Sequence, residues 1–382
     1  MRFLIISVGA AANKCAINLV EKEVVSKEDI MLINSTIKDI PAEYRDLAIR
    51  LSDTVQGCGQ ERSLGKEIAI SAINDGRLNL ESITTSDYDK VIVISSTCGG
   101  TGSGASVIIA NYLNKFLNVD VEIIGLVGFE DESARSLRNF IEFCQELKES
   151  YTIQFIRNSA FLSSTRGNRT AAELAANDEV AQRIRVMNGS LLKDSIQNID
   201  NTDIAKLNNS VGYKTVEYIE VQEKIKNVDQ FNDILKEMLD NSAMIEPDAT
   251  GVARLGVIMN LQNSSQQFID RSFNTLKKRL GMPYEVFTHL EYEPSMPEFI
   301  AIIASGMKMP AKEIQNIYDK YTELTSAVNK SKDSFFDNML EYKGDKGDAM
   351  FDNAHSVVGS KHSKINADDA RKAFLKSLEE ES

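Results

Sequence analysis

The stretch CGGTGSG, Cys98-Gly99-Gly100-Thr101-Gly102-Ser103-Gly104, decides the fold because of the segments on either side of it. A β-branched run at 91–94 precedes it and suits a buried parallel strand. Residues 105–116 follow it with apolar side chains at helical spacing. Four glycines at this junction leave the backbone accessible, and the start of the helix offers N–H groups and a positive dipole end. The pattern predicts a phosphate-binding loop, and a tight strand-to-helix connection is the alternative explanation for the same glycines.

Two other phosphate-binding motifs are absent from the sequence. The spacing between Gly59 and Gly65 is one residue too long for a Walker A loop. The first predicted strand, 3–8, runs into a segment with the single glycine Gly9, whereas a dinucleotide fingerprint needs several. A dinucleotide-dependent oxidoreductase would explain the alternating strands, but it also requires an acidic residue after the second strand, where Asn34 stands.

The composition of the 382 residues limits the possible partners of the chain. A hydrophobic content of 42% is enough for a sizeable core, and the length suggests two domains. The net charge of −13 argues against direct binding of nucleic acid or of an anionic membrane surface. No apolar run approaches the ~20 residues that span a bilayer, so we expect a cytoplasmic protein. The 4 cysteines form no CxxC pair, and neither a disulfide scaffold nor a metal site is predicted.

The order of the predicted elements indicates a large α/β domain followed by a smaller one. Strands predicted at 3–8, 30–33, 91–95, 121–127 and 153–156 alternate with helices, which predicts a doubly wound, mostly parallel sheet. A long helix is predicted from 170 to about 192, and strands at 252–261, 286–292 and 299–305 with a helix at 268–280 predict a second, α+β domain. We therefore divide the chain into a first domain (1–172), a central helix (173–192), a second domain (193–309) and a C-terminal segment (310–382).

CGGTGSG resembles the signature loop of the tubulin/FtsZ superfamily, GGGTG(S/T)G, and two further segments extend the likeness. The segment 57–65 resembles the family's third nucleotide loop, and Ala175-Ala176-Asn177-Asp178 resembles the start of its central helix. The resemblance implies that the first domain binds GTP or GDP with Mg²⁺, and that Asn177 and Asp178 read the guanine edge. The other nucleotide-binding residues that it implies are Ala11, Ala12, Asn13, Lys14, Cys15, Gly57, Cys58, Gly59, Asp131, Glu132, Arg135 and Asn158, together with Gly99 to Gly104.

The segment 201–206 is similar to the catalytic NxDxxD loop of the same family. That likeness implies that Asn201 and Asp203 act on GTP bound to a neighbouring subunit, so that the chain hydrolyses GTP as it assembles head to tail into homo-oligomeric filaments. A carboxylate in this place can orient and deprotonate the attacking water. Lys206 stands where many FtsZ proteins have the second acidic residue, so a nucleotide-binding filament protein with little turnover is an alternative.

The first nucleotide loop separates branches of the family. It carries alanines in place of several glycines, and its Cys15-Ala16-Ile17 ending resembles the TubZ-like branch of plasmids and phages. That branch implies segregation or positioning of DNA, while an FtsZ-like cell-division protein is the alternative.

In the tail, Ala370, Phe374 and Leu378 predict an amphipathic helix at 366–378 after a polar tether at 342–364. We expect this helix to dock on its own subunit, on the next subunit or on a DNA-binding adaptor protein.

Overall fold

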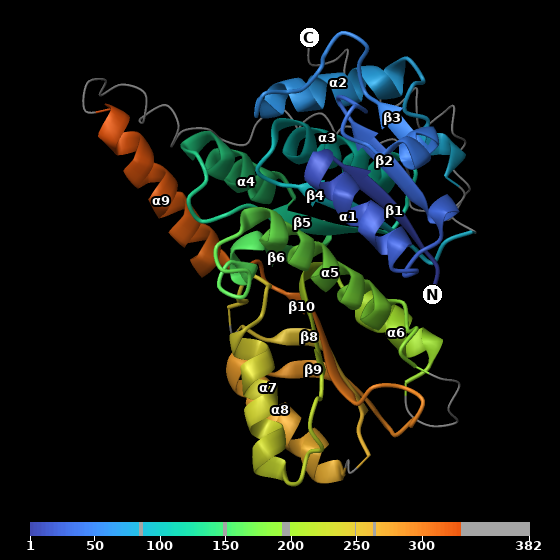
Figure 1. Cartoon of the computed structure of the whole chain (residues 1–382), viewed down its shortest axis with the longest axis vertical. Coiled ribbons are helices and arrows are strands. Elements are labelled where there is room, and N and C mark those ends of the chain that lie inside the picture. The colour runs from blue at the N-terminus through green and yellow to red at the C-terminus, as the bar shows by residue number, and fades with distance from the viewer. Residues whose placement is uncertain (84–86, 148–150, 193–198, 249, 263–264, 330–382) are drawn as a thin grey trace. The chain divides into compact units, whose positions relative to one another are not determined.

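The chain folds into two compact units in a computed structural model that describes residues 1–83, 87–147, 151–192, 199–248, 250–262 and 265–329. The part that we call the first unit comprises residues 3–17, 26–147 and 314–329. The second unit comprises residues 1–2, 18–25 and the described residues from 151 to 313. Each unit has its own portion of β-structure (Figure 1).

The first unit contains five strands in the order β3-β2-β1-β4-β5, and every neighbouring pair is parallel. Their bounds are Phe3–Val8 (β1), Ile30–Asn34 (β2), Ala48–Arg50 (β3), Lys90–Ser96 (β4) and Val121–Val127 (β5). The strand order reverses at β1, since β2 lies on one side of it and β4 on the other. Ligands of doubly wound sheets bind at the carboxyl ends of the strands at such a reversal. The segments after β1 and β4 therefore lie where a ligand is expected.

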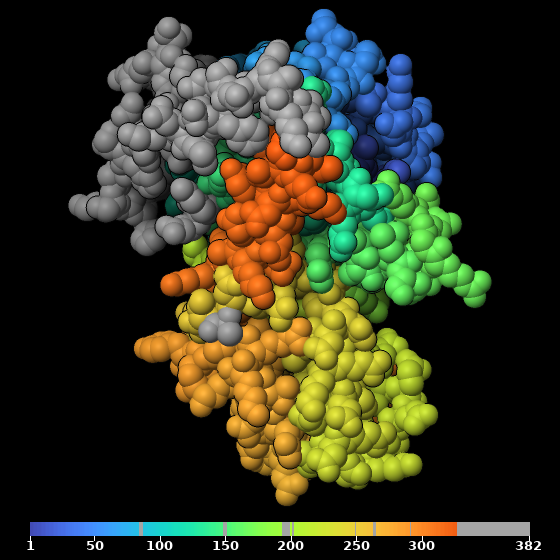
Figure 2. All heavy atoms as spheres, turned by 90° about the vertical axis from the view of Figure 1, so that its left-hand side faces the viewer, coloured from blue at the N-terminus to red at the C-terminus, as the bar shows by residue number. Residues whose placement is uncertain are grey.

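Helices cover both faces of this parallel sheet, and α3 is buried along its whole length. The bounds of the helices are Ala10–Glu21 (α1), Arg62–Asn74 (α2), Gly100–Asn111 (α3), Ala134–Leu147 (α4) and Ala311–Asn329 (α9). Helix α3 packs against α2 and α4 (Figure 1). On α4, Leu137 and Ile141 form an apolar cluster with Tyr321 of α9, whose outer face is drawn in orange in Figure 2.

The second unit combines parallel and antiparallel strands in the order β6-β7-β10-β8-β9. Their bounds are Thr152–Arg157 (β6), Gly212–Glu220 (β7), Val252–Asn260 (β8), Pro283–Glu291 (β9) and Phe299–Met307 (β10). Strand β10 is antiparallel to β7 and β8, while β6 with β7 and β8 with β9 are parallel. The helices are Arg169–Met187 (α5), Asn201–Asn208 (α6), Val228–Asp240 (α7) and Gln266–Leu280 (α8). Phe231 of α7 stacks on Phe268 of α8 with ring centroids 4.6 Å apart.

The predicted fold class is confirmed, and the predicted strands 3–8 and 121–127 coincide with β1 and β5. The predicted start of the helix after CGGTGSG was wrong, because α3 begins at Gly100 and not at residue 105. The long helix predicted to reach residue 192 ends at Met187, where Asn188 is followed by Gly189 with φ +76°. Strands β3 and β7 and helix α7 were not predicted.

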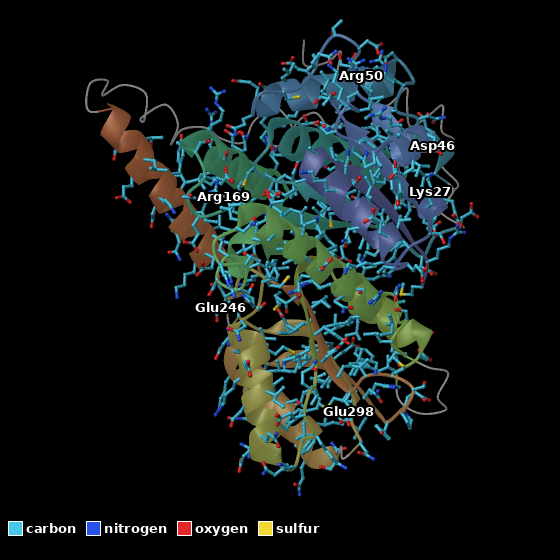
Figure 3. All side chains as sticks on the ribbon, in the orientation of Figure 1. Lys27, Asp46, Arg50, Arg169, Glu246 and Glu298 are labelled. Carbon is cyan, nitrogen blue, oxygen red and sulfur yellow. The ribbon has the colours of Figure 1, made fainter. Side chains whose placement is uncertain are left out.

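Two further sequence expectations concern the surface and the tail. No helix among the described residues is both long enough and apolar enough to cross a membrane. Surface charges form local pairs, such as Lys27 with Asp46 at 3.5 Å, both labelled in Figure 3. The predicted tether at 342–364 and the predicted helix at 366–378 lie outside the described residues.

Candidate functional site

The carboxyl ends of β1 and β4 lie side by side; Gly9 directly follows β1, and Gly99 stands three residues after the end of β4. Gly9, directly after β1, has φ +94°, a backbone conformation that favours glycine. A Cβ atom at Gly9 would also collide with the Ser96 hydroxyl at the end of β4. The sequence after β1 therefore needs glycine for local geometry, whether or not a ligand binds there.

The glycines of CGGTGSG fall into two groups. Three of them, Gly100, Gly102 and Gly104, are packed against backbone: a Cβ atom at Gly100 would lie 2.7 Å from the amide nitrogen of Glu61. At Gly104 it would collide with the carbonyl oxygen of Arg62 in α2. Gly99 differs, because a Cβ atom there would lie 3.7 Å from its nearest neighbour. Close packing of α3 thus explains three of the four glycines, and Gly99 is left with an open face.

The loop before α2 presents a second open glycine surface. Gly57 and Gly59 are exposed, and a Cβ atom on either would meet nothing within 4 Å. A Cβ atom on Gly65, in the first turn of α2, would collide with the carbonyl oxygen of Gly100, in the first turn of α3. The N-termini of α2 and α3 are therefore in direct contact, next to the open loops. Two adjacent helix N-termini combine N–H groups and positive dipole ends, which favours binding of an anion such as phosphate.

Hydroxyl and thiol groups join the loops to one another. Thr101 Oγ1 lies 3.0 Å from the hydroxyl of Ser35, in the segment after β2. The buried Cys58 thiol hydrogen-bonds to both hydroxyls, and burial raises its pKa against the opposing effect of these bonds. Ser103 donates to the carbonyl oxygen of Gly99 at 2.5 Å. The side chains of Thr101 and Ser103 are thus engaged with the protein, and the backbone is the part of CGGTGSG that can face a ligand.

The residues 11–15, expected to form a nucleotide loop, lie inside helix α1. The side chains of Ala12 and Cys15 are fully buried, Ala11 is half-buried and Lys14 is exposed. Asn13 is 2% exposed, and its Oδ1 accepts a hydrogen bond of 2.7 Å from the Ser7 hydroxyl. Its Nδ2 is buried without a hydrogen-bond partner. An unsatisfied buried donor costs about 1–3 kcal/mol, and an acceptor on a bound ligand would remove that cost.

The segment after β5 also reaches the loop before α2. Arg135, at the start of α4, pairs with Glu61 at 3.0 Å, and both side chains are exposed. Glu132 is half-buried and accepts from the amide nitrogen of Phe129 at 3.4 Å, whereas Asp131 is exposed. The structure therefore brings Arg135 to the loop, but it gives the two acidic residues different surroundings.

A cluster of charged side chains that no sequence motif indicates joins α2 to α4. The buried Arg62, first residue of α2, donates to both carboxylate oxygens of Glu146, at 2.5 and 2.7 Å. Lys66 approaches the same carboxylate at 2.6 Å. Burial would raise the pKa of Glu146, but the hydrogen bonds and charges of Arg62 and Lys66 hold that pKa below its usual value. This ion cluster fixes the start of α2 on the end of α4.

The two residues predicted to read guanine are neighbours on α5 with opposite exposure. Asn177 is 5% exposed, whereas the Asp178 side chain is about half exposed. The Oδ1 atom of Asp178 accepts from Asn18 Nδ2 at 3.0 Å and pairs with Lys22 Nζ at 3.0 Å. Asn158 begins a short 3-10 helix, Asn158–Phe161, directly after β6. All three residues, Asn158, Asn177 and Asp178, belong to the second unit.

The segment predicted as a catalytic loop is the first part of helix α6, which begins at Asn201. The amide nitrogen of Asp203 donates to Asp200 Oδ1 at 2.9 Å, which caps the helix. The Asp203 carboxylate lies 3.2 Å from Lys206 Nζ. Lys206 also lies 5.8 Å above the ring centroid of Phe287. The residue that departs from the family motif thus pairs directly with the candidate catalytic carboxylate.

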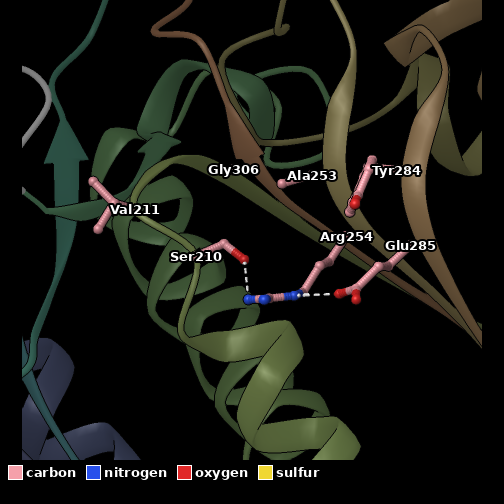
Figure 4. A pocket seen from close by; sticks show the side chains of 7 residues that line it. All are labelled: Ser210, Val211, Ala253, Arg254, Tyr284, Glu285 and Gly306. Carbon is pink, nitrogen blue, oxygen red and sulfur yellow. Dashed lines mark hydrogen bonds and ion pairs between the residues drawn. The ribbon is translucent and has the colours of Figure 1, made fainter.

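The second unit also contains a cavity of about 290 Å³ that holds none of the predicted site residues. Figure 4 shows its lining of Ser210, Val211, Ala253, Arg254, Tyr284, Glu285 and Gly306. Arg254 donates to Glu285 at 2.8 Å and to the Ser210 hydroxyl at 2.9 Å. Its charge is therefore balanced within the wall of the cavity.

Comparison with known proteins gives distant but broad similarities, although no protein-family model matches the chain. It is 30% identical over 112 residues to the tubulin-like protein CetZ1 of Haloferax volcanii, which covers 28% of each protein. It is 20% identical over 320 residues to the cell division protein FtsZ of Aquifex aeolicus, covering 81% of this chain and 84% of that one. The matches with three CetZ proteins of H. volcanii span from 28% to 61% of those proteins' lengths.

Solved structures share the fold at low sequence identity. A GTPγS-bound protofilament of H. volcanii CetZ2 has a TM-score of 0.69 at 17% identity, covering 86% of this chain and 100% of that one. A GTPγS-form protofilament of TubZ from Bacillus thuringiensis serovar israelensis also has a TM-score of 0.69, at 15% identity, with coverages of 86% and 94%. The fold therefore does not distinguish between these two branches.

Proposed function

Because this chain belongs to the tubulin/FtsZ superfamily, we propose that it binds GTP and hydrolyses it while assembling head to tail into cytoskeletal filaments. One observation carries the proposal: the N-termini of α2 and α3 touch beside the open glycines Gly57, Gly59 and Gly99. Two helix dipoles and accessible backbone N–H groups suit the polyphosphate of a nucleotide. The CetZ2 structure is a GTPγS-bound protofilament and the TubZ structure is a GTPγS-form protofilament, which supports both parts of the proposal.

We assign the phosphates to backbone groups of the loops before α2 and α3. Gly99 and the first turn of α3 face the phosphates, with Arg135 adding positive charge near the loop before α2. The orphaned Nδ2 of Asn13 supports a ligand acceptor near α1. Mg²⁺ would neutralise phosphate charge and take its ligands chiefly from phosphate and water. The remaining predicted residues, Ala11, Ala12, Lys14, Cys15, Cys58, Asp131, Glu132 and Asn158, keep their assignment to the nucleotide as a proposal.

For the base, Asn177 and Asp178 provide oxygen acceptors for the N1–H and 2-amino groups of guanine. Adenine does not present these donors in that arrangement, so it would leave the acceptors without partners. Asp178 is accessible, and its Oδ1 is already held by Asn18 and Lys22, which orients the carboxylate.

For hydrolysis, Asp203 with Asn201 would act on the nucleotide of the next subunit. A carboxylate that orients and deprotonates water contributes typically ~10²–10⁴-fold to a rate. Lys206 already occupies Asp203 Oδ1, and this contact supports the alternative of a filament protein with little turnover. Assembly would complete the site, so hydrolysis would depend on filament formation.

We place the biological role in the cytoplasm, in moving or positioning plasmid or phage DNA through an adaptor protein bound to the C-terminal tail. Cys15 in α1 supports the TubZ-like branch. An FtsZ-like role in cell division is the second candidate, because the similarity to the A. aeolicus FtsZ covers most of both chains.

Binding of fluorescent GTP and ATP analogues to the monomer tests the proposal. We expect a preference for GTP of about a hundredfold or more, because an unmatched base leaves the acceptors of the site unpaired. Asp178→Ala should erode this preference by about tenfold, while the affinity for inorganic triphosphate stays the same. Equal affinity of the unmodified chain for the two nucleotides would refute the assignment.

A further inference from the structure

Asn139 of α4 bridges the two glycine-containing loops. It is 3% exposed and lies among apolar residues of α4, including Phe140 and Phe143. Its Nδ2 donates to the carbonyl oxygen of Gln60 at 3.0 Å and to that of Cys98 at 3.1 Å. Since both partners are carbonyl oxygens, only the amide nitrogen can face them, and its two protons serve one loop each.

The backbone that Asn139 holds at Gln60 has an unusual conformation. Gln60 has φ +63°, in the left-handed region that costs a non-glycine residue about 1–2 kcal/mol. Gly59 beside it has φ +53°, so two consecutive residues of the loop are left-handed. Such a conformation persists only where the surroundings determine it. The bond from Asn139 is one of those determinants.

At its other end, Asn139 holds the carbonyl of Cys98, which precedes the open residue Gly99. The Cys98 sulfur in turn accepts from the amide nitrogen of Gly128 at 3.4 Å. A shift of the Cys98 peptide would move the Gly99 N–H and the start of α3. One side chain therefore bonds to the backbone of both loops, the one before α2 and the one before α3.

We propose that Asn139 is a positioning residue that fixes the two phosphate-binding loops against each other before the nucleotide binds. The inference rests on the proposed function in one respect, namely that the ligand of the loops is a nucleotide. The two hydrogen bonds of Asn139 are present in the chain without ligand. Hydrogen bonds that pre-organise a site raise affinity by lowering the ordering cost on binding.

The variant Asn139→Leu removes both donors while keeping the size of the side chain. Asn260 offers a matched control, because it is also buried and also donates to two carbonyl oxygens, those of Glu293 and Pro297. Asn260→Leu therefore removes the same kind of contact outside the residues assigned to the nucleotide. If Asn139→Leu does not fold, Asn139→Ser retains one donor and should show a smaller effect in the same direction.

Two measurements on the full chain separate positioning from a general loss of stability. The first is the affinity of the monomer for a fluorescent GTP analogue, measured at a temperature at which the unmodified chain and both variants are folded. This affinity should fall about tenfold in Asn139→Leu and less than twofold in Asn260→Leu. Hydrogen exchange of the nucleotide-free protein should accelerate in residues 58–62 and 98–101 for Asn139→Leu alone.

Equal affinity losses in the two variants, or unchanged exchange in either loop, would overturn the positioning role. If the unmodified chain binds no guanine nucleotide, the proposed function fails. The exchange experiment then still decides whether Asn139 holds the two loops together.

Discussion

The two units differ in the groups that they offer to a ligand. In the first unit, the loops around Gly59 and Gly99 offer backbone, and their side chains bond to the protein: Thr101 to Ser35, and Ser103 to the carbonyl of Gly99. In the second unit, Asp178 and Asp203 offer carboxylates on helix surfaces. A substitution in the first region should therefore act through shape and stability. A substitution in the second should act through chemistry while the fold stays intact.

The largest expected effect is that of Asp203→Asn on hydrolysis. Loss of the carboxylate should lower the rate of GTP hydrolysis by about 10²-fold or more, because the amide cannot take a proton from water. The unfolding free energy should change by less than about 1 kcal/mol, as for other surface substitutions. Phosphate release and urea unfolding measure the two quantities. The control Asp229→Asn removes an exposed acid from the first turn of α7 and should leave both unchanged; equal rates for the two variants would remove Asp203 from the chemistry.

In the first region, Gly104→Ala should act on stability. A methyl group there would collide with the carbonyl oxygen of Arg62, and backbone cannot move aside as a flexible side chain can. We expect the unfolding free energy to fall by about 2–3 kcal/mol, as for other overpacked cores. Urea unfolding measures it. Unchanged stability would mean that α2 and α3 are not in backbone contact.

Gly99→Ala sharpens the contrast within the same heptapeptide. Its φ of −87° is accessible to alanine, and the added methyl group would be in ordinary contact at 3.7 Å, so stability should change by less than about 0.5 kcal/mol. Affinity for GTP should nevertheless drop, because the methyl group stands on the open face. Titration with a fluorescent GTP analogue tests this. Retained affinity would move the ligand away from Gly99.

The smallest effect concerns the ion cluster between α2 and α4. Arg62 and Lys66 hold the pKa of Glu146 below its usual value, so the cluster stabilises the fold at pH values above the carboxyl pKa of the unfolded chain. That stabilisation should disappear as the pH falls through the lower pKa of the folded state. Between pH 7 and acidic pH, the melting temperature should depend less on pH in Glu146→Gln than in the exposed control Glu67→Gln. The same pH dependence in both variants would show that Glu146 keeps an ordinary pKa.

Much of the fold followed from the sequence, because short runs rich in apolar and β-branched residues, such as 3–8 and 121–127, are typical of buried parallel strands. Strand β7 was missed because Lys214 and Glu217 interrupt its apolar pattern. These residues are buried and paired with side chains outside the strand, including Asn208 and Ser242, and sequence spacing does not reveal such contacts.

Within the candidate site, the sequence indicated loops that the structure brings together, but not the reason for each glycine. The contact of α2 with α3 accounts for Gly100 and Gly104, and it also allows the helix to begin at glycine despite the low helix propensity of that residue. Asn139 was missed because a single polar residue on an amphipathic helix carries no motif. Its role depends on two carbonyl groups that are 79 and 41 residues away in the chain.

The concentration dependence of GTP hydrolysis tests the central claim, that association completes the site, most directly. Phosphate release should be followed together with light scattering as the protein is diluted. We expect the rate per molecule to rise with concentration and to vanish below the concentration at which scattering disappears, because Asp203 acts on the nucleotide of the next subunit. A rate per molecule that stays constant into the range without polymer would contradict the account, because it would mean that one chain contains the complete site.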